Sequence, residues 1–247
     1  MSNSYYEQTR FLIIAPKRSG GTLLSHALDS HMDIFCHRGE PIHRLDPIRQ
    51  IADSPFEAID TCLKMMGYEA SGCKLTYEDV KRIGLESIRH FKVNRIIHLW
   101  RENPLKRIVS EQVRLQDKKQ GLRTHTRESR PLETITLDPQ KTVSEIGKYW
   151  ADVNMYRRIL KSQTVGTGKA YMEIIYEQIA YYHNIIERDL GFALQDFLGT
   201  STKQMLKYSI VKRNPFPLRD IIENYDELYE YMRNHAYLYL KYFEDTD

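Results

Sequence analysis

The chain has 247 residues, and its 36 Lys and Arg nearly balance its 33 Asp and Glu, which gives a net charge of +3. This length suits one α/β domain with a substantial core, and this charge argues against a protein dedicated to nucleic acid polymers. The three cysteines lack the spacing of zinc ligands or of a disulfide framework, the amino terminus is polar, and no run of about 18 apolar residues follows, so we expect a cytoplasmic protein with no metal and no transmembrane segment.

Apolar runs and helical patterns alternate along the chain. Strands are predicted near 11–15, 72–76, 94–100 and 170–175, and helices near 21–31, 55–67, 78–91, 104–119, 142–163, 176–190 and 218–242. This alternation predicts an α/β fold, in which helices cover both faces of a central parallel sheet within a single domain spanning residues 1–247. The long polar segment 120–141 interrupts the pattern, and we interpret it as a functional loop.

The first predicted strand leads into a basic, glycine-bearing turn, in the sequence FLIIAPKRSGGTLLS of residues 11–25. Pro16 ends the strand, and Gly20 and Gly21 allow the backbone to turn sharply before the helix. Amide hydrogens at a helix start favour an anion, here those of Ser19 to Leu23, and Lys17 and Arg18 add full charges. The turn therefore predicts a phosphate-binding site.

The nucleotide triphosphate loop of P-loop kinases and hydrolases, G-x-x-x-x-G-K-[ST], is the first comparison. It fails at two positions, because Ala15 stands where the first glycine belongs and Gly21 where the lysine belongs, although Thr22 fits. The segment PKRSGGTLL instead resembles the 5′-phosphosulfate loop of sulfotransferases that use 3′-phosphoadenylyl sulfate (PAPS).

Three later segments resemble other motifs of that family, in particular its bacterial carbohydrate branch, which includes nodulation-factor and trehalose sulfotransferases. In NRIIHLWRENPLKRIVS, residues 94–110, Arg101 leaves a strand and Ser110 follows nine residues later, as in the 3′-phosphate motif. The segment AYMEIIYEQI places Tyr176 in the position of a tyrosine near the adenosine. In YSIVKRNPFPLRDIIENYDEL, residues 208–228, Lys212 and Arg213 match a late basic loop over the nucleotide.

The resemblance implies a P-loop-like three-layer sulfotransferase fold and transfer of a sulfuryl group from PAPS to a hydroxyl, leaving PAP. In-line transfer builds negative charge on the bridging and equatorial oxygens, as in phosphoryl transfer. Cations and amides must neutralise it. Arg18 and the Ser19 to Leu23 amides are placed to do so, and Lys74, in GCKLTYED, resembles the family lysine beside the transferred group.

A hydroxyl acceptor also needs a base. Glu40 is our first candidate, because the family carries a catalytic glutamate in this region and Pro41 holds the preceding residue extended. His37 and His43 flank it and are rival candidates, since histidine titrates near neutral pH.

Two other functions compete with this interpretation. A nucleotide kinase or hydrolase would use the first loop for a triphosphate and require magnesium, and a catalytically idle relative would bind the donor without turnover. The resemblance favours a carbohydrate, glycolipid or small natural product as acceptor. Segment 120–141, with Arg123, Arg127 and Arg130, would then be an acceptor-side lid, and the protein could form a homodimer.

Overall fold

The computed structural model describes residues 8–119, 134–179, 184–209 and 217–244. Their elements follow one another as β1 (Thr9–Ala15), α1 (Gly21–Leu28), β2 (Ile34–His37), α2 (Pro47–Ile51), α3 (Pro55–Leu63), β3 (Ala70–Thr76), α4 (Tyr77–Ile83), α5 (Ser87–His90), β4 (Arg95–Trp100), α6 (Pro104–Lys119), α7 (Pro139–Ser162), β5 (Ala170–Ile175), α8 (Tyr176–Ile179), α9 (Arg188–Leu198), α10 (Leu218–Ile221), α11 (Tyr225–His235) and the 3-10 helix η1 (Tyr237–Tyr242).

The chain divides into two compact units. The first contains residues 1–100 and 157–209, and the second contains residues 101–156 and 210–247. One boundary falls directly after β4 and another falls inside α7. The prediction of a single domain stays a prediction.

The first unit is built on a five-stranded sheet with the order β2-β3-β1-β4-β5. All four strand pairs are parallel. The order reverses at β1, because the next two strands lie on one side of it and the last two on the other. In open sheets of this kind, ligands bind beyond the carboxyl ends of the strands at such a reversal.

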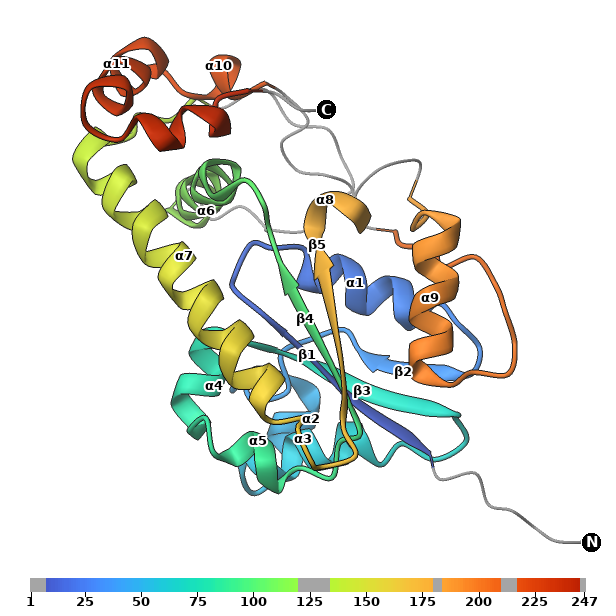
Figure 1. The fold of residues 1–247 in the computed structure, drawn as a ribbon. Helices are drawn as coiled ribbons and strands as arrows, with labels where there is room; N and C mark the ends of the chain where they lie inside the picture. Colours follow the sequence, from blue (N-terminus) through green and yellow to red (C-terminus); the bar gives the residue numbers. More distant parts are fainter. Residues whose placement is uncertain (1–7, 120–133, 180–183, 210–216, 245–247) are drawn as a thin grey trace, which may run out of the picture. The chain divides into compact units, whose positions relative to one another are not determined.

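Helices cover both faces of this sheet, which confirms the predicted α/β class (Figure 1). Phe11, Ile13 and Ala15 of β1 belong to one buried cluster with residues of α1, α8 and α9. The alternate residues Leu12 and Ile14 are also fully buried, and α3 and α4 contact β3 on that other face (Figure 1). Because both faces are covered, β1 is apolar from Phe11 to Ala15 rather than alternating.

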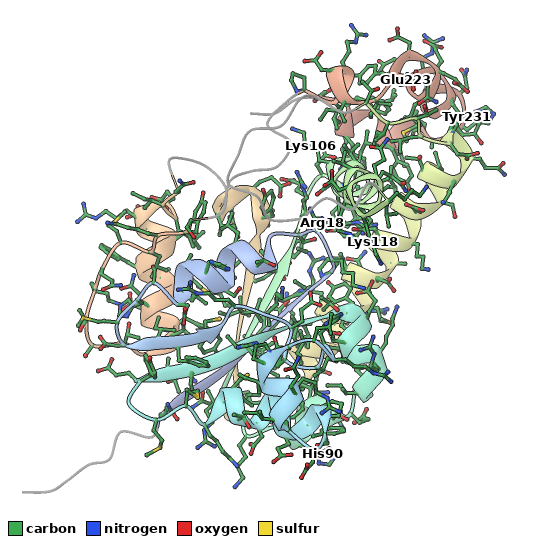
Figure 2. The ribbon with its side chains drawn as sticks, turned by 180° about the vertical axis from the view of Figure 1, so that it is seen from behind. Arg18, His90, Lys106, Lys118, Glu223 and Tyr231 are labelled. Carbon is green, nitrogen blue, oxygen red and sulfur yellow. The ribbon has the colours of Figure 1, made fainter. Side chains whose placement is uncertain are left out.

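The second unit has a core of its own between helices. Apolar residues of α6, α7, α10, α11 and η1 form one buried cluster, which includes Leu105, Ile108, Ile146, Leu228 and Met232. Ile135 and Leu137, which lie between α6 and α7, are buried in the same cluster. Figure 2 shows Lys106 and Lys118 on α6 of this unit, and Glu223 and Tyr231 near its carboxyl-terminal helices.

Most predicted elements are confirmed, and three predicted helices are wrong in extent. The helix expected over 78–91 is broken at Gly84, which has a φ of 85°. The helix expected over 176–190 is not continuous, because the described residues 184–187 between α8 and α9 are not helical. The helix expected over 218–242 is interrupted at Asn224 and Ala236. The predictions contained neither β2 nor α2.

Candidate functional site

The turn between β1 and α1 has the geometry of an anion-binding loop. Arg18 has a φ of 65° and Gly20 a φ of 82°, whereas Ser19 and Gly21 have negative φ. Alternation of this kind points successive amide hydrogens into one concavity. A left-handed arginine costs on the order of 1–3 kcal/mol and is found mainly where function requires it.

The amide hydrogens of this loop remain available. Within the described residues, no acceptor takes those of Ser19 to Leu23, and Gly20 caps α1 without a side-chain bond. The hydroxyl of Ser19 is fully buried and has no hydrogen-bond partner in the described part of the chain. Because buried polar groups are nearly always satisfied, these donors indicate a ligand with several acceptor oxygens.

Lys74 approaches the loop from β3. Its side chain is 6% exposed, its Nζ donates a hydrogen bond to Thr22 Oγ1 at 3.0 Å, and it lies 3.6 Å from Glu40 Oε1. A Cβ on Gly21 would lie 2.7 Å from Lys74 Cδ. The space of a side chain at position 21 is thus filled by a lysine from another strand. Lys74 thus brings to the loop the ammonium that the P-loop pattern would place at position 21.

Glu40 lies in the turn that follows β2, with a side chain that is 36% exposed. The carboxylate therefore remains accessible while it faces the Lys74 ammonium. His37, the last residue of β2, is held differently: its Nε2 lies 2.7 Å from Oδ2 of the buried Asp46. His43 is exposed on the same turn. Of the three candidate bases, Glu40 is the one whose side chain pairs with Lys74.

Tyr176 completes this group of residues. It is the first residue after β5, and its ring lies against the loop, because a Cβ on Gly20 would come within 2.7 Å of Tyr176 Cε2. The left-handed φ and the close ring both require glycine at position 20. Lys17 is exposed on the loop. The structure thus brings Lys74, Glu40 and Tyr176 to the loop that follows β1.

Figure 2 shows where this edge lies within the first unit. Arg18 follows β1 at one end of the unit, and His90, the last residue of α5, lies at the opposite end (Figure 2). The site is therefore at the edge where the general rule for open sheets places ligands.

The remaining predicted donor contacts belong to the second unit or lie outside the described residues. Arg101 directly follows β4 and is buried, and Ser110 lies on α6 and is partly buried. The hydroxyl of Tyr149 accepts a hydrogen bond from the Arg101 amide at 2.8 Å and donates one to the Arg101 carbonyl at 2.7 Å. Lys212 and Arg213 lie outside the described residues, as do Arg123, Arg127 and Arg130 of the predicted lid.

Asp46 and Tyr149 were not found by sequence analysis. Asp46 carries a detectable signal, because an aspartate followed by Pro47 is a typical helix start, and Asp46 Oδ1 does accept a hydrogen bond from Ile48 N at 3.0 Å. Its second bond, to His37, has no sequence signature. Tyr149 lies inside a long helical pattern, where a tyrosine predicts only packing.

Solved structures that are similar include a sulfotransferase from Alicyclobacillus acidocaldarius. It is 17% identical, the match covers 96% of this chain and 95% of that chain, and the TM-score is 0.49. No protein-family model and no curated protein matches the chain. The α/β fold described above follows from the chain's own sheet order and does not depend on this similarity.

A separate polar network lies around His98, on the face of the sheet that α3 and α4 cover. His98 of β4 is fully buried between two tyrosine hydroxyls, with Nε2 2.6 Å from Tyr77 and Nδ1 2.9 Å from Tyr171. Tyr171 donates in turn to Glu173 Oε2 at 3.2 Å. This direction makes Nδ1 of His98 the donor and Nε2 the acceptor. Burial lowers the pKa of His98 from 6.5 to about 4, although the Glu173 charge opposes the shift.

Among the described residues, no group of three or more His, Cys, Asp or Glu side chains could hold a metal ion. None of the described helices combines the length and the hydrophobicity of a membrane-spanning segment. Cys36, Cys62 and Cys73 are buried free thiols.

Proposed function

We propose that this protein is a PAPS-dependent sulfotransferase that transfers a sulfuryl group to the hydroxyl of a carbohydrate, glycolipid or small natural product. The observation that carries the proposal is the buried Lys74 ammonium beside the open amides of Ser19 to Leu23. A buried cation is costly without a close anion, and Glu40 Oε1 at 3.6 Å is beyond hydrogen-bond distance. A bound phosphosulfate group would complete the neutralisation.

In this proposal the loop holds the 5′-phosphosulfate end of the donor. The Ser19 to Leu23 amides, the Ser19 hydroxyl and Arg18 bind its oxygens, and Lys74 and Thr22 lie beside the transferred group. Tyr176, whose ring lies beside Gly20, would lie near the adenosine, as the sequence resemblance implies. Electrostatic donors of this kind are typically worth about 2.7–4 kcal/mol of barrier each when they meet developing charge.

The chemical step is an in-line transfer with Glu40 as the base. The acceptor oxygen forms a bond to sulfur while the bond from sulfur to the bridging oxygen breaks. The electron pair of that bond leaves with the 5′-phosphate of PAP, and the acceptor proton passes to the Glu40 carboxylate. Lys74 stabilises the negative charge that grows on the bridging and sulfuryl oxygens.

The other parts of the proposal rest on the sequence resemblance. Arg101, Ser110, Lys212 and Arg213 would bind the 3′-phosphate and cover the nucleotide, and segment 120–141 would face the acceptor. We further propose a cytoplasmic location, which suits three buried free thiols, and a reaction that needs no metal, since the loop supplies its own cations. A homodimer is also part of the proposal.

Calorimetric titration with 3′,5′-ADP and with ATP tests the donor class. We expect tight binding of 3′,5′-ADP without magnesium and weaker binding of ATP. Arg18→Ala should weaken 3′,5′-ADP binding by about 10- to 100-fold, on the scale of charge-assisted contacts. Arg38→Ala is the matched control, because Arg38 is exposed and paired with Asp29. Tight, magnesium-dependent ATP binding with indifference to 3′,5′-ADP would reject the proposal in favour of a kinase or hydrolase.

Turnover is tested by incubating the protein and PAPS with extracts of its source and searching by mass spectrometry for products heavier by one sulfonate group. EDTA should leave the yield unchanged. A yield that collapses on chelation would contradict the metal-free mechanism. Donor binding without any product across a broad acceptor panel would instead favour a catalytically idle protein.

A further inference from the structure

We propose that Asp46 is a positioning residue for Glu40, because it closes a ring with His37 that fixes the turn carrying the carboxylate. This inference rests on the proposed function, in which Glu40 is the base. It assigns a role to the contact between His37 and Asp46, which are nine positions apart. It also explains why His37, a rival candidate base, is held by a carboxylate.

The ring is closed by a short, largely buried contact. His37 Nε2 lies 2.7 Å from Asp46 Oδ2, and the two side chains are 15% and 6% exposed. The backbone between them makes two consecutive turns, since His43 N donates to Glu40 O and Asp46 N donates to His43 O, each at 2.8 Å. The carbonyl of Glu40 is therefore fixed by the same turns that the ring encloses.

Gly39 shows how tightly the ring is packed beside Glu40. A Cβ at this position would lie 2.9 Å from His37 Nε2 and closer still to Asp46 Oδ2. Its φ is not in the left-handed region, so glycine is required here for space rather than for backbone conformation. Any larger residue must push His37 and Asp46 apart, which would open the ring next to the base.

The contact between Glu40 and Lys74 explains why the position of the turn matters. The Glu40 carboxylate is 3.6 Å from Lys74 Nζ, which in turn donates to Thr22 on the loop. The position of the Glu40 backbone, which the ring and its turns fix, sets the point from which this carboxylate reaches Lys74. A displacement of about 1 Å in a catalytic group can cost on the order of 100-fold in rate.

The same contact has a rival interpretation, because an imidazole oriented by a carboxylate is also the arrangement of a general base. In that case Asp46 would act through His37 and not through Glu40. The two roles differ in one measurable respect: whether the effect of an Asp46 substitution on turnover depends on the presence of the Glu40 carboxylate.

Asp46→Ser is the first variant of the test. Serine is a good helix N-cap, so it retains the bond to Ile48 N while it removes the bond to His37. We expect kcat to fall about 10- to 100-fold, with 3′,5′-ADP affinity changed less than about twofold. Ser54→Ala is the matched control, because it removes the cap of α3, a bond to Glu57 N, without touching the turn. Its kcat should be that of the wild type.

The Glu40→Gln background then separates the two roles. If Asp46 acts through Glu40, Asp46→Ser causes no further loss of kcat there. A further loss of about tenfold or more would overturn the inference and favour His37 as the base. Gly39→Ala opens the ring without removing a functional group and should behave in the same way, which keeps the test valid if Asp46→Ser fails to fold.

The inference and the proposed function fail separately. A wild-type protein that neither binds 3′,5′-ADP nor transfers sulfate contradicts the proposed function. A wild-type protein that does both, together with full kcat in folded Asp46→Ser and Gly39→Ala, contradicts only the role of Asp46.

Discussion

The two units position their predicted site residues in different ways. In the first unit, side chains from the ends of separate strands meet: Lys74 bonds Thr22 and faces Glu40, and Tyr176 lies against Gly20. In the second unit, Arg101 is held through its backbone, because one hydroxyl, that of Tyr149, bonds both its amide and its carbonyl. The first arrangement depends on the order of strands, whereas the second depends on one tyrosine in a helix.

This difference has a physical origin. Residues at the carboxyl ends of adjacent parallel strands are brought together by the sheet itself, and the register aligns Ile13 of β1 with Lys74 of β3. Arg101 comes after the last residue of β4, where the ladder no longer satisfies the backbone. The buried amide and carbonyl of a residue at such a point need other hydrogen-bond partners. The Tyr149 hydroxyl supplies both bonds to Arg101.

The largest expected effect comes from the Glu40 carboxylate in the first unit. Glu40→Gln removes the proton acceptor but keeps the size of the side chain, so kcat should fall by about 10²- to 10⁴-fold while 3′,5′-ADP still binds. Glu86→Gln, which changes an exposed glutamate paired with Arg89, is the control. Activity that survives in Glu40→Gln and disappears in His37→Ala or His43→Ala would move the base to a histidine.

The second effect is on stability and should be confined to the first unit. His98 has a pKa of about 4 in the folded protein, against 6.5 for an ordinary histidine. Between these values the unfolded chain binds a proton that the folded chain does not, so stability is complete above about pH 6.5 and falls as the pH decreases. The total loss at about pH 4 is on the order of 3 kcal/mol.

Hydrogen exchange at pH 7 and pH 5 measures this effect in each unit. Protection should decrease in the strands that surround His98. His98→Gln should flatten the pH dependence, although it also disturbs the bonds to Tyr77 and Tyr171. His90→Gln is the control, because His90 is exposed in the same unit. Equal loss of protection in both units on acidification would contradict the assignment to His98.

Gly20 offers the next test, because a matched glycine exists in the same unit. Gly20→Ala and Gly67→Ala both place a side chain at a left-handed φ, of 82° and 87°, but only the former brings a Cβ against Tyr176. Each should lose about 1 kcal/mol of stability from the backbone, and only Gly20→Ala should weaken 3′,5′-ADP binding, by about tenfold or more. Equal nucleotide affinity in the two variants would show that the loop does not bind the donor.

Much of the fold could be predicted from sequence, and the reasons differ between elements. The strands β1 and β4 are largely apolar and are buried on both faces, and a run of that kind is a strong local signal. The edge strand β2 has only four residues, Ile34 to His37, and it is defined by pairing with β3, which is not local. The helix expected over 176–190 was wrong in extent because its sequence pattern does not show the break at residues 184–187, before α9 begins at Arg188.

The candidate site was predictable in its parts and not in its contacts. The loop residues could be named because glycines and basic residues between a buried strand and a helix are typical of an anion-binding turn. That Lys74 fills the space beside Gly21 could not be foreseen, since Lys74 and Thr22 are 52 positions apart and meet only through the pairing of β1 with β3. Asp46 and Tyr149 each act through two specific hydrogen bonds, and such contacts leave no periodic pattern in a sequence.

The smallest expected effect concerns the second unit, in which Tyr149 bonds the backbone of Arg101. Tyr149→Phe leaves the Arg101 guanidinium in place but removes the hydroxyl that bonds the Arg101 amide and carbonyl. A looser backbone should weaken 3′,5′-ADP binding by about 5- to 10-fold, the scale of one hydrogen bond of about 1 kcal/mol. Affinity for 5′-AMP should not change, because 5′-AMP lacks the 3′-phosphate that Arg101 is proposed to bind.

Tyr242→Phe is the matched control for that variant. It also removes a tyrosine hydroxyl within the second unit, one that accepts a hydrogen bond from Trp150 Nε1 at 2.7 Å, and it keeps the Tyr242 carbonyl that accepts from Asn103. If Tyr149 acts by holding Arg101, the Arg101→Ala background abolishes the effect of Tyr149→Phe on 3′,5′-ADP affinity. Additive losses in the double variant, or equal losses in Tyr242→Phe, would mean that Tyr149 contributes only to the packing of the second unit.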